Sequence, residues 1–331
     1  MQSYRGRGTA LMFNNYHYFI ALAEEGNISR AARKLFISHQ CLSRYLKNLE
    51  QEYKVTFFER ASKLILTPAG QAYLSAVRQM QLLEENLDSQ LDDIRQAKRG
   101  NLVFGTTDGR YRILVPDLLA QFKGLYPDVI LEARSSPDSK KLSEQVLEGE
   151  LDVVLLNKSD ISNKQLVLQP VLDERMYLII SDNMLKTCFP NRYPQCVQDF
   201  AKGVNLSQFQ HVPFVLGRKN LVSRRLIDEY CQAHQIQLNC VMELGQLDLH
   251  GMMTARDYAA SFCWSMFLPA IQKLNGEGRF SHLHIVPIKG QGITNQLVLA
   301  TRKGKIFPAY GRAFIRLIKE NCAAFSELSP A

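Results

Sequence analysis

The stretch that decides the fold is SRAARKLFISHQCLSRYL, residues 29–46. Ser29 and Ser38 each stand before a short apolar-periodic run, where a hydroxyl can cap a helix. The second run continues to about Glu52, and its apolar residues recur at steps of four, three and four: Leu42, Leu46, Leu49 and Tyr53. A helix over 14–25, ended by Gly26, precedes both. Three short helices joined by tight turns predict a helix-turn-helix.

The opposite face of the third helix is polar and cationic, with His39, Gln40, Ser43, Arg44 and Lys47. Reading DNA in the major groove needs such a face, because amide and hydroxyl groups meet base edges while cations meet phosphates. An ordinary solvated helix face has the same composition. The stripe alone therefore leaves both interpretations open.

The segment after the third helix favours the DNA-binding interpretation. Residues 54–66 predict a short two-stranded wing with Lys63 near its tip, and Thr67 and Pro68 are typical of a helix start. Residues 1–70 hold ten Lys and Arg against five acids, so five of the eight net positive charges lie in about a fifth of the chain. This excess indicates a phosphate-binding face.

The segment from Tyr16 to Tyr73 resembles the DNA-binding domain of the LysR-type transcriptional regulators. The matching residues are Ala23-Glu24-Glu25-Gly26, Ser29, Ala31-Ala32, Leu35, Ile37-Ser38, Leu42-Ser43, Leu46, Leu49-Glu50, Phe58-Glu59-Arg60 and Leu66-Thr67-Pro68-Ala69-Gly70. The resemblance implies operator contacts from Ser38, His39, Gln40, Ser43 and Arg44, a DNA-backbone contact from Arg60, and a minor-groove approach by Lys63.

Three departures from the family pattern concern base preference and the wing. Gln40 and Cys41 replace the usual Pro-Ala of the recognition helix, Lys54 replaces a common Gly, and the wing is one residue short. The fold that the resemblance implies is unaffected by these changes.

Residues 69–98 predict a long dimerising helix. Apolar residues follow an a/d heptad rhythm that only Gln90 interrupts: Tyr73, Ala76, Met80, Leu83, Leu87, Ile94 and Ala97. Such a seam is typical of a coiled coil, and the family's linker helix dimerises. A helix packed on its own domain is the alternative.

Beyond Gly100 strands and helices alternate, which predicts a parallel α/β sheet. Residues 126–129 and 148–152 resemble the effector-binding half of the same family. That half is periplasmic-binding-protein-like, with two α/β subdomains linked by crossing strands near 177–181 and 284–288. The expected domains are a disordered leader (1–12), a winged helix-turn-helix (13–70), a linker helix (71–99), subdomain I (100–180 and 286–322), subdomain II (181–285) and a tail (323–331).

The effector cleft is expected beyond the carboxyl ends of the strands, where ligands of open α/β sheets lie. The residues that follow the strands are Thr106, Thr107, Asp108, Ser135, Ser136, Asn157, Arg218, Lys219, Asn220 and Gln246. Thr106, Thr107 and Arg218 suit an anionic effector such as a carboxylate, whereas Asp108 argues against a purely anion-binding cleft. Ordinary caps and loop residues are the alternative for each position.

Three other functions have weaker support. His282 and His284 share one side of a strand, but no third ligand is spaced for a metal. Cys188 with Cys196, or Cys231 with Cys240, could form a redox pair. However, none of these cysteines aligns with the reactive cysteine of the family's peroxide sensors. Since the motifs of hydrolases, phosphate loops and dinucleotide sites are absent, we expect no catalytic residue and no cofactor. A solute-binding or catalytic α/β protein with an incidental helical N-terminus is the competing class.

The expected location is the cytoplasm, because no apolar run approaches 20 residues and no signal peptide begins the chain. Seven cysteines without a Cys-x-x-Cys pair indicate reduced thiols. The predicted function is a transcription regulator that binds an interrupted inverted repeat of double-stranded DNA as a homodimer or homotetramer. A small-molecule effector would shift the dimer arrangement, and RNA polymerase is an implied partner.

Overall fold

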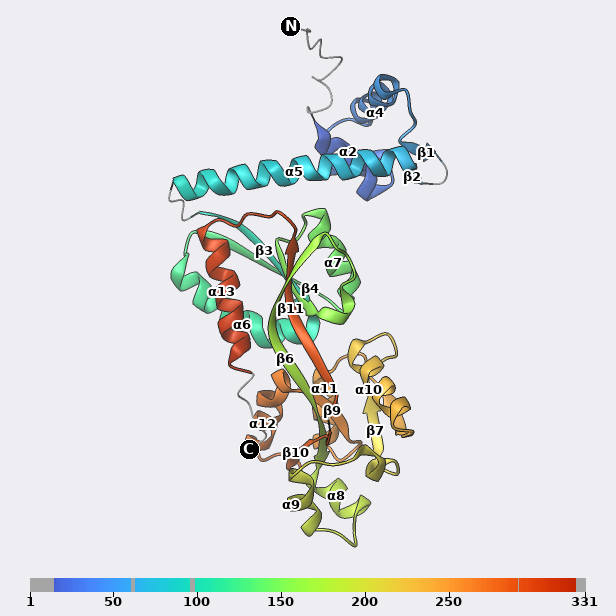
Figure 1. Ribbon diagram of the computed structural model, residues 1–331, viewed down its shortest axis with the longest axis vertical. Coiled ribbons are helices and arrows are strands. Elements are labelled where there is room, and N and C mark those ends of the chain that lie inside the picture. The colour runs from blue at the N-terminus through green and yellow to red at the C-terminus, as the bar shows by residue number, and fades with distance from the viewer. Residues whose placement is uncertain (1–14, 61–62, 96–98, 291, 326–331) are drawn as a thin grey trace. The chain divides into compact units, whose positions relative to one another are not determined.

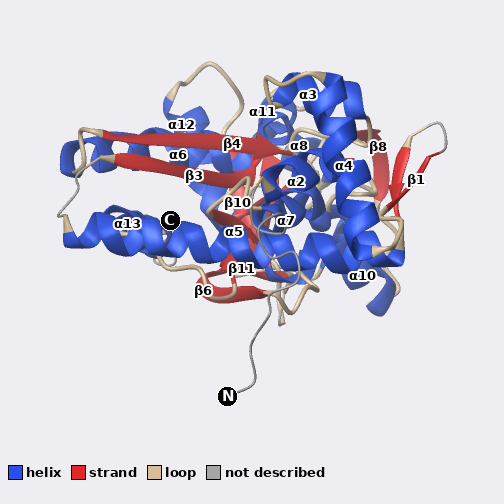
Figure 2. Ribbon diagram, turned by 90° about the horizontal axis from the view of Figure 1, so that it is seen from above, coloured by secondary structure: helices blue, strands red, loops and turns tan. Residues whose placement is uncertain are grey.

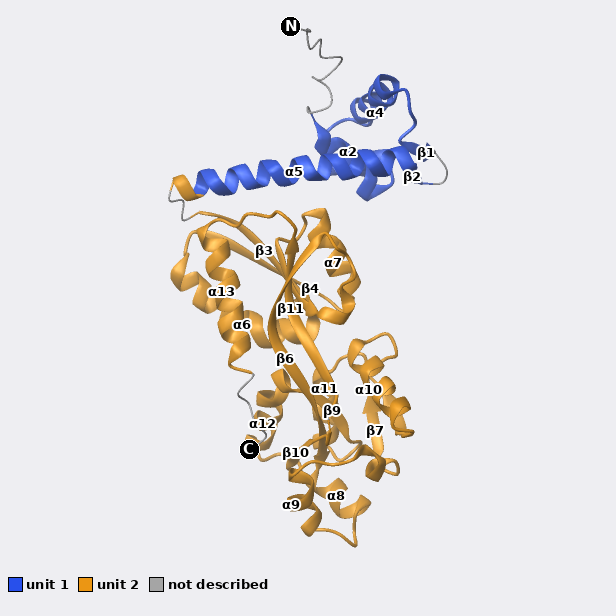
Figure 3. Ribbon diagram, in the orientation of Figure 1, with its two compact units in different colours: residues 1–92 blue, residues 93–331 orange. Residues whose placement is uncertain are grey.

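The computed structural model describes residues 15–60, 63–95, 99–290 and 292–325, apart from the side chain of Arg60. The chain forms two compact units, residues 1–92 and 93–331 (Figure 3). No helix in the described ranges is both long and apolar enough to cross a membrane. The expected leader over 1–12, and the tail after Phe325, lie outside the described residues.

Unit 1 contains the predicted three helices and wing (Figure 1). The wing strands are antiparallel, with Phe58 opposite Leu66. The core is built from Phe19, Leu22, Leu42, Leu46, Phe58 and Tyr73. Tyr53, predicted to close the apolar stripe, is instead 37% exposed. The elements are α2 (Tyr16–Glu25), α3 (Ile28–Lys34), α4 (His39–Tyr53), β1 (Phe58–Arg60), β2 (Leu64–Leu66) and α5 (Pro68–Ile94).

Two of the three predicted helix caps are confirmed. Ser38 Oγ accepts from the backbone N–H of Cys41 at 3.1 Å, and Thr67 Oγ1 accepts from that of Gly70 at 3.1 Å. The prediction for Ser29 was wrong, because α3 begins earlier and Asn27 caps it by accepting from the Arg30 N–H at 3.0 Å. Asn and Ser are equally good caps, so composition could not place this boundary.

The long helix α5 has two distinct halves. Its first half belongs to the unit 1 core through Tyr73 and Val77. A Cβ at Gly70 would lie 2.2 Å from the carbonyl oxygen of Phe57, so only glycine fits there. In the second half, part of the predicted seam is uncovered, with Leu83, Leu87 and Ile94 exposed by 68%, 55% and 77%. Ala97 lies outside the described residues.

Unit 2 is organised around a seven-stranded sheet of order β10-β6-β11-β5-β3-β4, with β9 paired to β6. As predicted, β3 is parallel to both β4 and β5, whereas β11 is antiparallel to its two neighbours. The first elements are β3 (Gly100–Thr107), α6 (Asp108–Leu125), β4 (Val129–Ser136), α7 (Ser139–Glu148), β5 (Val153–Asn157), η1 (Lys158–Asp160) and β6 (Leu166–Ser181).

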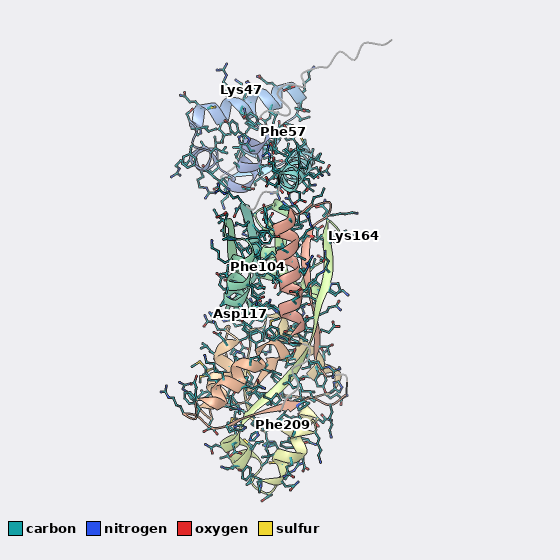
Figure 4. All side chains as sticks on the ribbon, turned by 90° about the vertical axis from the view of Figure 1, so that its left-hand side faces the viewer. Lys47, Phe57, Phe104, Asp117, Lys164 and Phe209 are labelled. Carbon is teal, nitrogen blue, oxygen red and sulfur yellow. The ribbon has the colours of Figure 1, made fainter. Side chains whose placement is uncertain are left out.

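Helices α6 and α13 (Ala309–Ala323) pack on one face of this sheet through Leu114, Leu118, Phe122 and Phe314 (Figures 1 and 2). Helix α7 forms a separate core with Val154 and Leu156. On α6, Val115 is also buried, whereas Leu119 is 38% exposed. Phe104 of β3, labelled in Figure 4, belongs to the core that α6 and α13 form with the sheet.

The other half of unit 2 has its own core, which includes Phe209 (Figure 4). This half also contains a two-stranded parallel sheet of β7 and β8. Its elements are α8 (Asp182–Cys188), α9 (Gln195–Ala201), η2 (Leu206–Phe209), β7 (Pro213–Leu216), α10 (Val222–Ala233), β8 (Asn239–Glu243), α11 (Asp248–Ala255), β9 (Ser261–Trp264), η3 (Ser265–Phe267), α12 (Leu268–Gly276) and β10 (Leu283–Pro287).

Two long strands run between the halves of unit 2 (Figure 1). The 16-residue β6 pairs with β11 (Thr294–Arg302) through its first part and with β10 and β9 through its last part. The first crossing strand, β6, contains the predicted segment 177–181 as its last five residues and begins earlier, at Leu166. The second was predicted at 284–288, but that segment is β10, which pairs with residues 177–181, and the crossing is made by β11.

Candidate functional site

The polar face of α4 is accessible. His39, Gln40, Arg44 and Lys47 are exposed and Ser43 is partly exposed, while Leu42, Leu46 and Leu49 are buried on the other side. Figure 4 labels Lys47 on α4 and Phe57 in the unit core. Ser38 fixes the start of the helix as its cap. The sequence-predicted DNA-contacting residues of α4 therefore share one exposed surface.

The cations near α4 differ in their partners. Lys34 lies 2.9 Å from Glu24, and Arg30 lies 3.5 Å from Glu25, so α3 is largely neutralised. Within the described part of the chain, Arg44, Lys47 and the exposed wing residue Lys63 have no ion pair with an acid. Their charge is free to meet phosphates. The side chain of Arg60 lies outside the described residues.

A cavity of about 590 Å³ lies between the two halves of unit 2. Residues at the N-termini of four helices line it, namely α6, α7, α10 and α11. Three of these termini, those of α6, α10 and α11, carry no side-chain cap. Free backbone N–H groups at a helix N-terminus attract anions. Five of the residues expected after the strands line this cavity: Thr107, Asp108, Asn157, Asn220 and Gln246.

The other expected cleft residues lie elsewhere. Thr106 is fully buried and donates to the carbonyl of Leu155 at 3.0 Å, because successive side chains of a strand point to opposite faces. Ser135 and Lys219 are exposed outside the cavity. Ser136 accepts from the Asp138 N–H at 3.1 Å. Arg218 is exposed and packs against Gly245, so it does not line the cavity.

Sequence reasoning missed Arg110, which forms the charged floor of the cavity. Its Nη2 donates to Asn157 at 2.9 Å and to Glu174 at 2.8 Å, and its Nη1 donates to Thr107 at 3.3 Å. Asn295 of β11 donates to the same two acceptors, at 2.7 and 3.1 Å. The helix dipole disfavours a cation in the first turn of a helix. The position of Arg110 was therefore the one sign in the sequence that this arginine has a special role.

Two ion pairs join the halves of unit 2 across the cavity. Arg112 of α6 contacts Asp248 of α11. Arg225 of α10 lies 3.6 Å from Asp160 and donates to Ser159 at 3.3 Å. These four charged residues all line the cavity and were not predicted. In the first pair the arginine comes from the half that contains α6, and in the second pair it comes from the half that contains α10.

Metal and redox sites gain no support. The described residues contain no group of three His, Cys, Asp or Glu side chains arranged for a metal, and His284 instead contacts Asp182 at 3.2 Å. All seven cysteines are free. Burial raises the pKa of the Cys231 thiol to about 11, which disfavours the reactive thiolate.

Both units match known protein families. Residues 13–71 match the family model described as the bacterial regulatory helix-turn-helix protein of the lysR family. Residues 95–323 match that of the LysR substrate binding domain, which covers more than half of the chain. The chain belongs to the LysR family of transcriptional regulators. This LysR-family protein is therefore a DNA-binding transcription regulator with an effector-binding domain and not an enzyme, as its motifs predict.

Relatives of this LysR-family regulator agree along most of its length. A probable RuBisCO transcriptional regulator of Trieres chinensis is 27% identical over 283 residues, covering 84% of this chain and 86% of the relative. The transcriptional activator CmpR of Synechocystis is 22% identical over 304 residues, covering 91% and 93%.

Solved structures share the fold of this LysR-family regulator. A full-length OxyR variant from Pseudomonas aeruginosa has a TM-score of 0.67 at 20% identity, covering 96% of this chain and 95% of its own. Full-length CbnR in complex with its target DNA has a TM-score of 0.52 at 20% identity, covering 92% and 97%.

Proposed function

We propose that α4 reads an interrupted inverted repeat in the major groove, one half-site for each copy of the chain. The observation that carries this proposal is the unpaired cationic and amide surface of α4 beside the wing. Gln40 has the side chain that pairs with adenine edges, and Arg44 the one that pairs with guanine or phosphate. His39, Ser38, Ser43, Lys47, Arg60 and Lys63 complete the interface. CbnR, a structural neighbour, is described in complex with its target DNA.

The second half of α5 joins two copies in this proposal. Leu83, Leu87 and Ile94 form an exposed apolar stripe that is unusual on a helix facing water. Pairing two such helices would cover it. The unit 2 halves would then join dimers into tetramers, and RNA polymerase would be contacted by the assembly on DNA. We place this activity in the cytoplasm.

The effector of the proposed regulator is a small anion, such as a carboxylate, held in the cavity of unit 2. Support comes from the three uncapped helix N-termini, those of α6, α10 and α11, and from the guanidinium groups of Arg110, Arg112 and Arg225 around the cavity. Thr107, Asn157 and Gln246 would add hydrogen bonds. Asp108, Asp138, Asp160 and Asp248 balance these cations, so a second, polar or cationic group on the effector is tolerated.

A selection experiment tests the DNA-binding proposal. The full-length chain would be used to select duplexes from a random pool, and the selected sites would be footprinted. Two half-sites of inverted sequence, spaced by about 10 base pairs or a multiple, are expected. Selection of unrelated sequences, with affinity that depends on salt alone, would contradict it.

A thermal-shift panel tests the effector proposal independently of DNA. Carboxylates, amino acids and aromatic acids would be added to the full-length chain. A ligand that binds only the folded state adds roughly 2.7 kcal/mol at 100 times its dissociation constant. Stabilisation by anions alone is expected, and stabilisation restricted to neutral or cationic compounds would contradict an anion site.

A further inference from the structure

A second cavity, of about 210 Å³, adjoins the first. It lies between the start of α6 and the elements α10, α11, β9 and α12, and we name it the apolar pocket. Its walls are mainly hydrocarbon and aromatic: Met176, Ile227, Phe262, Trp264, Phe267 and Ile271. None of the residues expected to bind an effector from the sequence belongs to this pocket.

Three polar side chains in the wall of the apolar pocket already have partners. Ser261 shares a hydrogen bond with Thr254 at 2.8 Å, and the Cys263 thiol donates to the carbonyl of Trp264 at 3.3 Å. His250 Nε2 donates to the carbonyl of Leu244 at 3.1 Å. Burial lowers the pKa of His250, so its ring is neutral at neutral pH. The deep wall therefore offers hydrocarbon contact without charge, which suits an apolar group.

The volume sets the size of that group. A dry protein cavity of about 150 Å³ binds benzene. At about 210 Å³ the apolar pocket fits one six-membered ring with a short linker, or a branched alkyl group of the same bulk.

The apolar pocket and the larger cavity of about 590 Å³ share part of their walls. Gly109, Arg112, Leu247, Asp248, Trp264 and Phe267 line both. A Cβ at Gly109 would lie 3.2 Å from the Phe267 ring, so glycine allows that ring to approach the start of α6. The Arg112–Asp248 pair thus stands at the junction of a polar and an apolar compartment.

We propose that the effector is amphipathic, with an anionic group among the helix N-termini and a single ring or equivalent alkyl group in the apolar pocket. This inference rests on the proposed effector site and names its ligand class. Because the group in the apolar pocket touches both α6 and α12, its binding couples the two halves of unit 2.

Matched acids that differ by one ring test the inference on the full-length chain. Propionate, 3-phenylpropionate and the neutral 3-phenylpropanol would be titrated by calorimetry. Each buried methylene strengthens binding about fourfold, so 3-phenylpropionate should bind at least tenfold tighter than propionate. The variant Ala270→Phe would fill the apolar pocket from α12, where Ala270 is an exposed wall residue. Gln272→Phe, exposed on the same helix outside that wall, is the matched control.

The expected result is a ring preference in the wild type and in Gln272→Phe that falls to within about twofold in Ala270→Phe, with unchanged melting temperatures. Equal binding of both acids, or a ring preference that survives Ala270→Phe, would overturn the inference while leaving the anion site standing. Binding of 3-phenylpropanol alone, lost in Ala270→Phe, would support the pocket and contradict the anion site. Failure of all three compounds to bind would overturn the apolar pocket as a ligand site.

Discussion

The guanidinium of Arg110 donates to the carboxylate of Glu174 at 2.8 Å, where Arg110 is 5% exposed and Glu174 is fully buried. Arg110 lies in the first turn of α6, and Glu174 lies on the crossing strand β6. Within the described residues, Arg110 Nε and Glu174 Oε1 lack a further partner. The pair therefore links the cavity floor to a strand shared by both halves of unit 2.

Glu174→Gln should strongly destabilise unit 2, because it leaves the Arg110 charge buried without a counter-ion. Removing one partner of a buried pair costs on the order of 3–5 kcal/mol. Calorimetric melting of the full-length chain measures the loss. The control is Glu132→Gln in the exposed pair with Arg134, which should leave the melting temperature unchanged. Equal losses in both variants would contradict the role given to the buried pair.

Thr106→Val and Thr107→Val should separate stability from ligand binding. Thr106 donates a buried hydrogen bond to Leu155, so its loss should cost about 1 kcal/mol. Thr107 lines the cavity and accepts a longer hydrogen bond, 3.3 Å, from Arg110 Nη1, so its substitution should cost less stability than that of Thr106 while weakening any carboxylate that stabilises the wild type. Thermal shift with and without the carboxylate measures both effects. A loss of ligand binding in Thr106→Val but not in Thr107→Val would contradict the assignment of Thr107 to the cavity.

Arg44→Ala should weaken operator binding, because Arg44 is an unpaired cation on the exposed face of α4. If Arg44 contacts a phosphate, the slope of log affinity against log salt should shrink by about one unit. Fluorescence anisotropy at several salt concentrations measures both. Arg316→Ala, an exposed arginine on α13, should change neither. Unaltered affinity and footprint in Arg44→Ala would exclude this recognition face.

Leu83→Asn combined with Leu87→Asn should dissociate the dimer. Each leucine buried at a seam contributes about 1.5–3 kcal/mol, and both copies lose it. Sedimentation velocity across a concentration series checks the assembly state. Asp88→Asn introduces the same side chain at an exposed position next to Leu87 and should leave assembly intact. A double variant that sediments like the wild type would show that α5 is not the dimer seam.

Lys54→Gly should stabilise unit 1. Lys54 ends α4 in the left-handed region, with φ at 54°, where a Cβ is strained and glycine is not. The expected gain is about 0.5–1 kcal/mol, measured calorimetrically without DNA. Lys54→Ala removes the same amine but keeps the Cβ, so it should bring no gain. A gain shared by both variants would point to the lysine charge rather than to backbone strain.

Local patterns predicted local structure well. Gly26 ends α2, while Ser38 and Thr67 cap the starts of α4 and α5, as their residue types indicated. The helix-turn-helix followed in the same way, since Leu42, Leu46 and Leu49 lie within two turns of one helix. Such signals depend on neighbours in sequence and need no knowledge of the sheet.

Long-range pairing could not be predicted from the same patterns. The sequences of β10 and β11 both favour a strand, and only the pairing partners decide which of the two crosses between the halves. Arg110 and Glu174 are 64 residues apart, so no local pattern joins them. Thr106 and Thr107 are adjacent and alike, and a register shift of one residue decides which faces the cavity.

Strand β11 sets the order in which the growing chain can acquire its parts. It lies between β5 and β6, so the sheet of unit 2 lacks a central member until Arg302 has left the ribosome. The core of unit 1 is complete far earlier, at Val77. Domains fold as units, the N-terminal one first during synthesis. A chain whose synthesis stops before β11 therefore keeps the fold of unit 1 but lacks a strand that joins the two halves of unit 2.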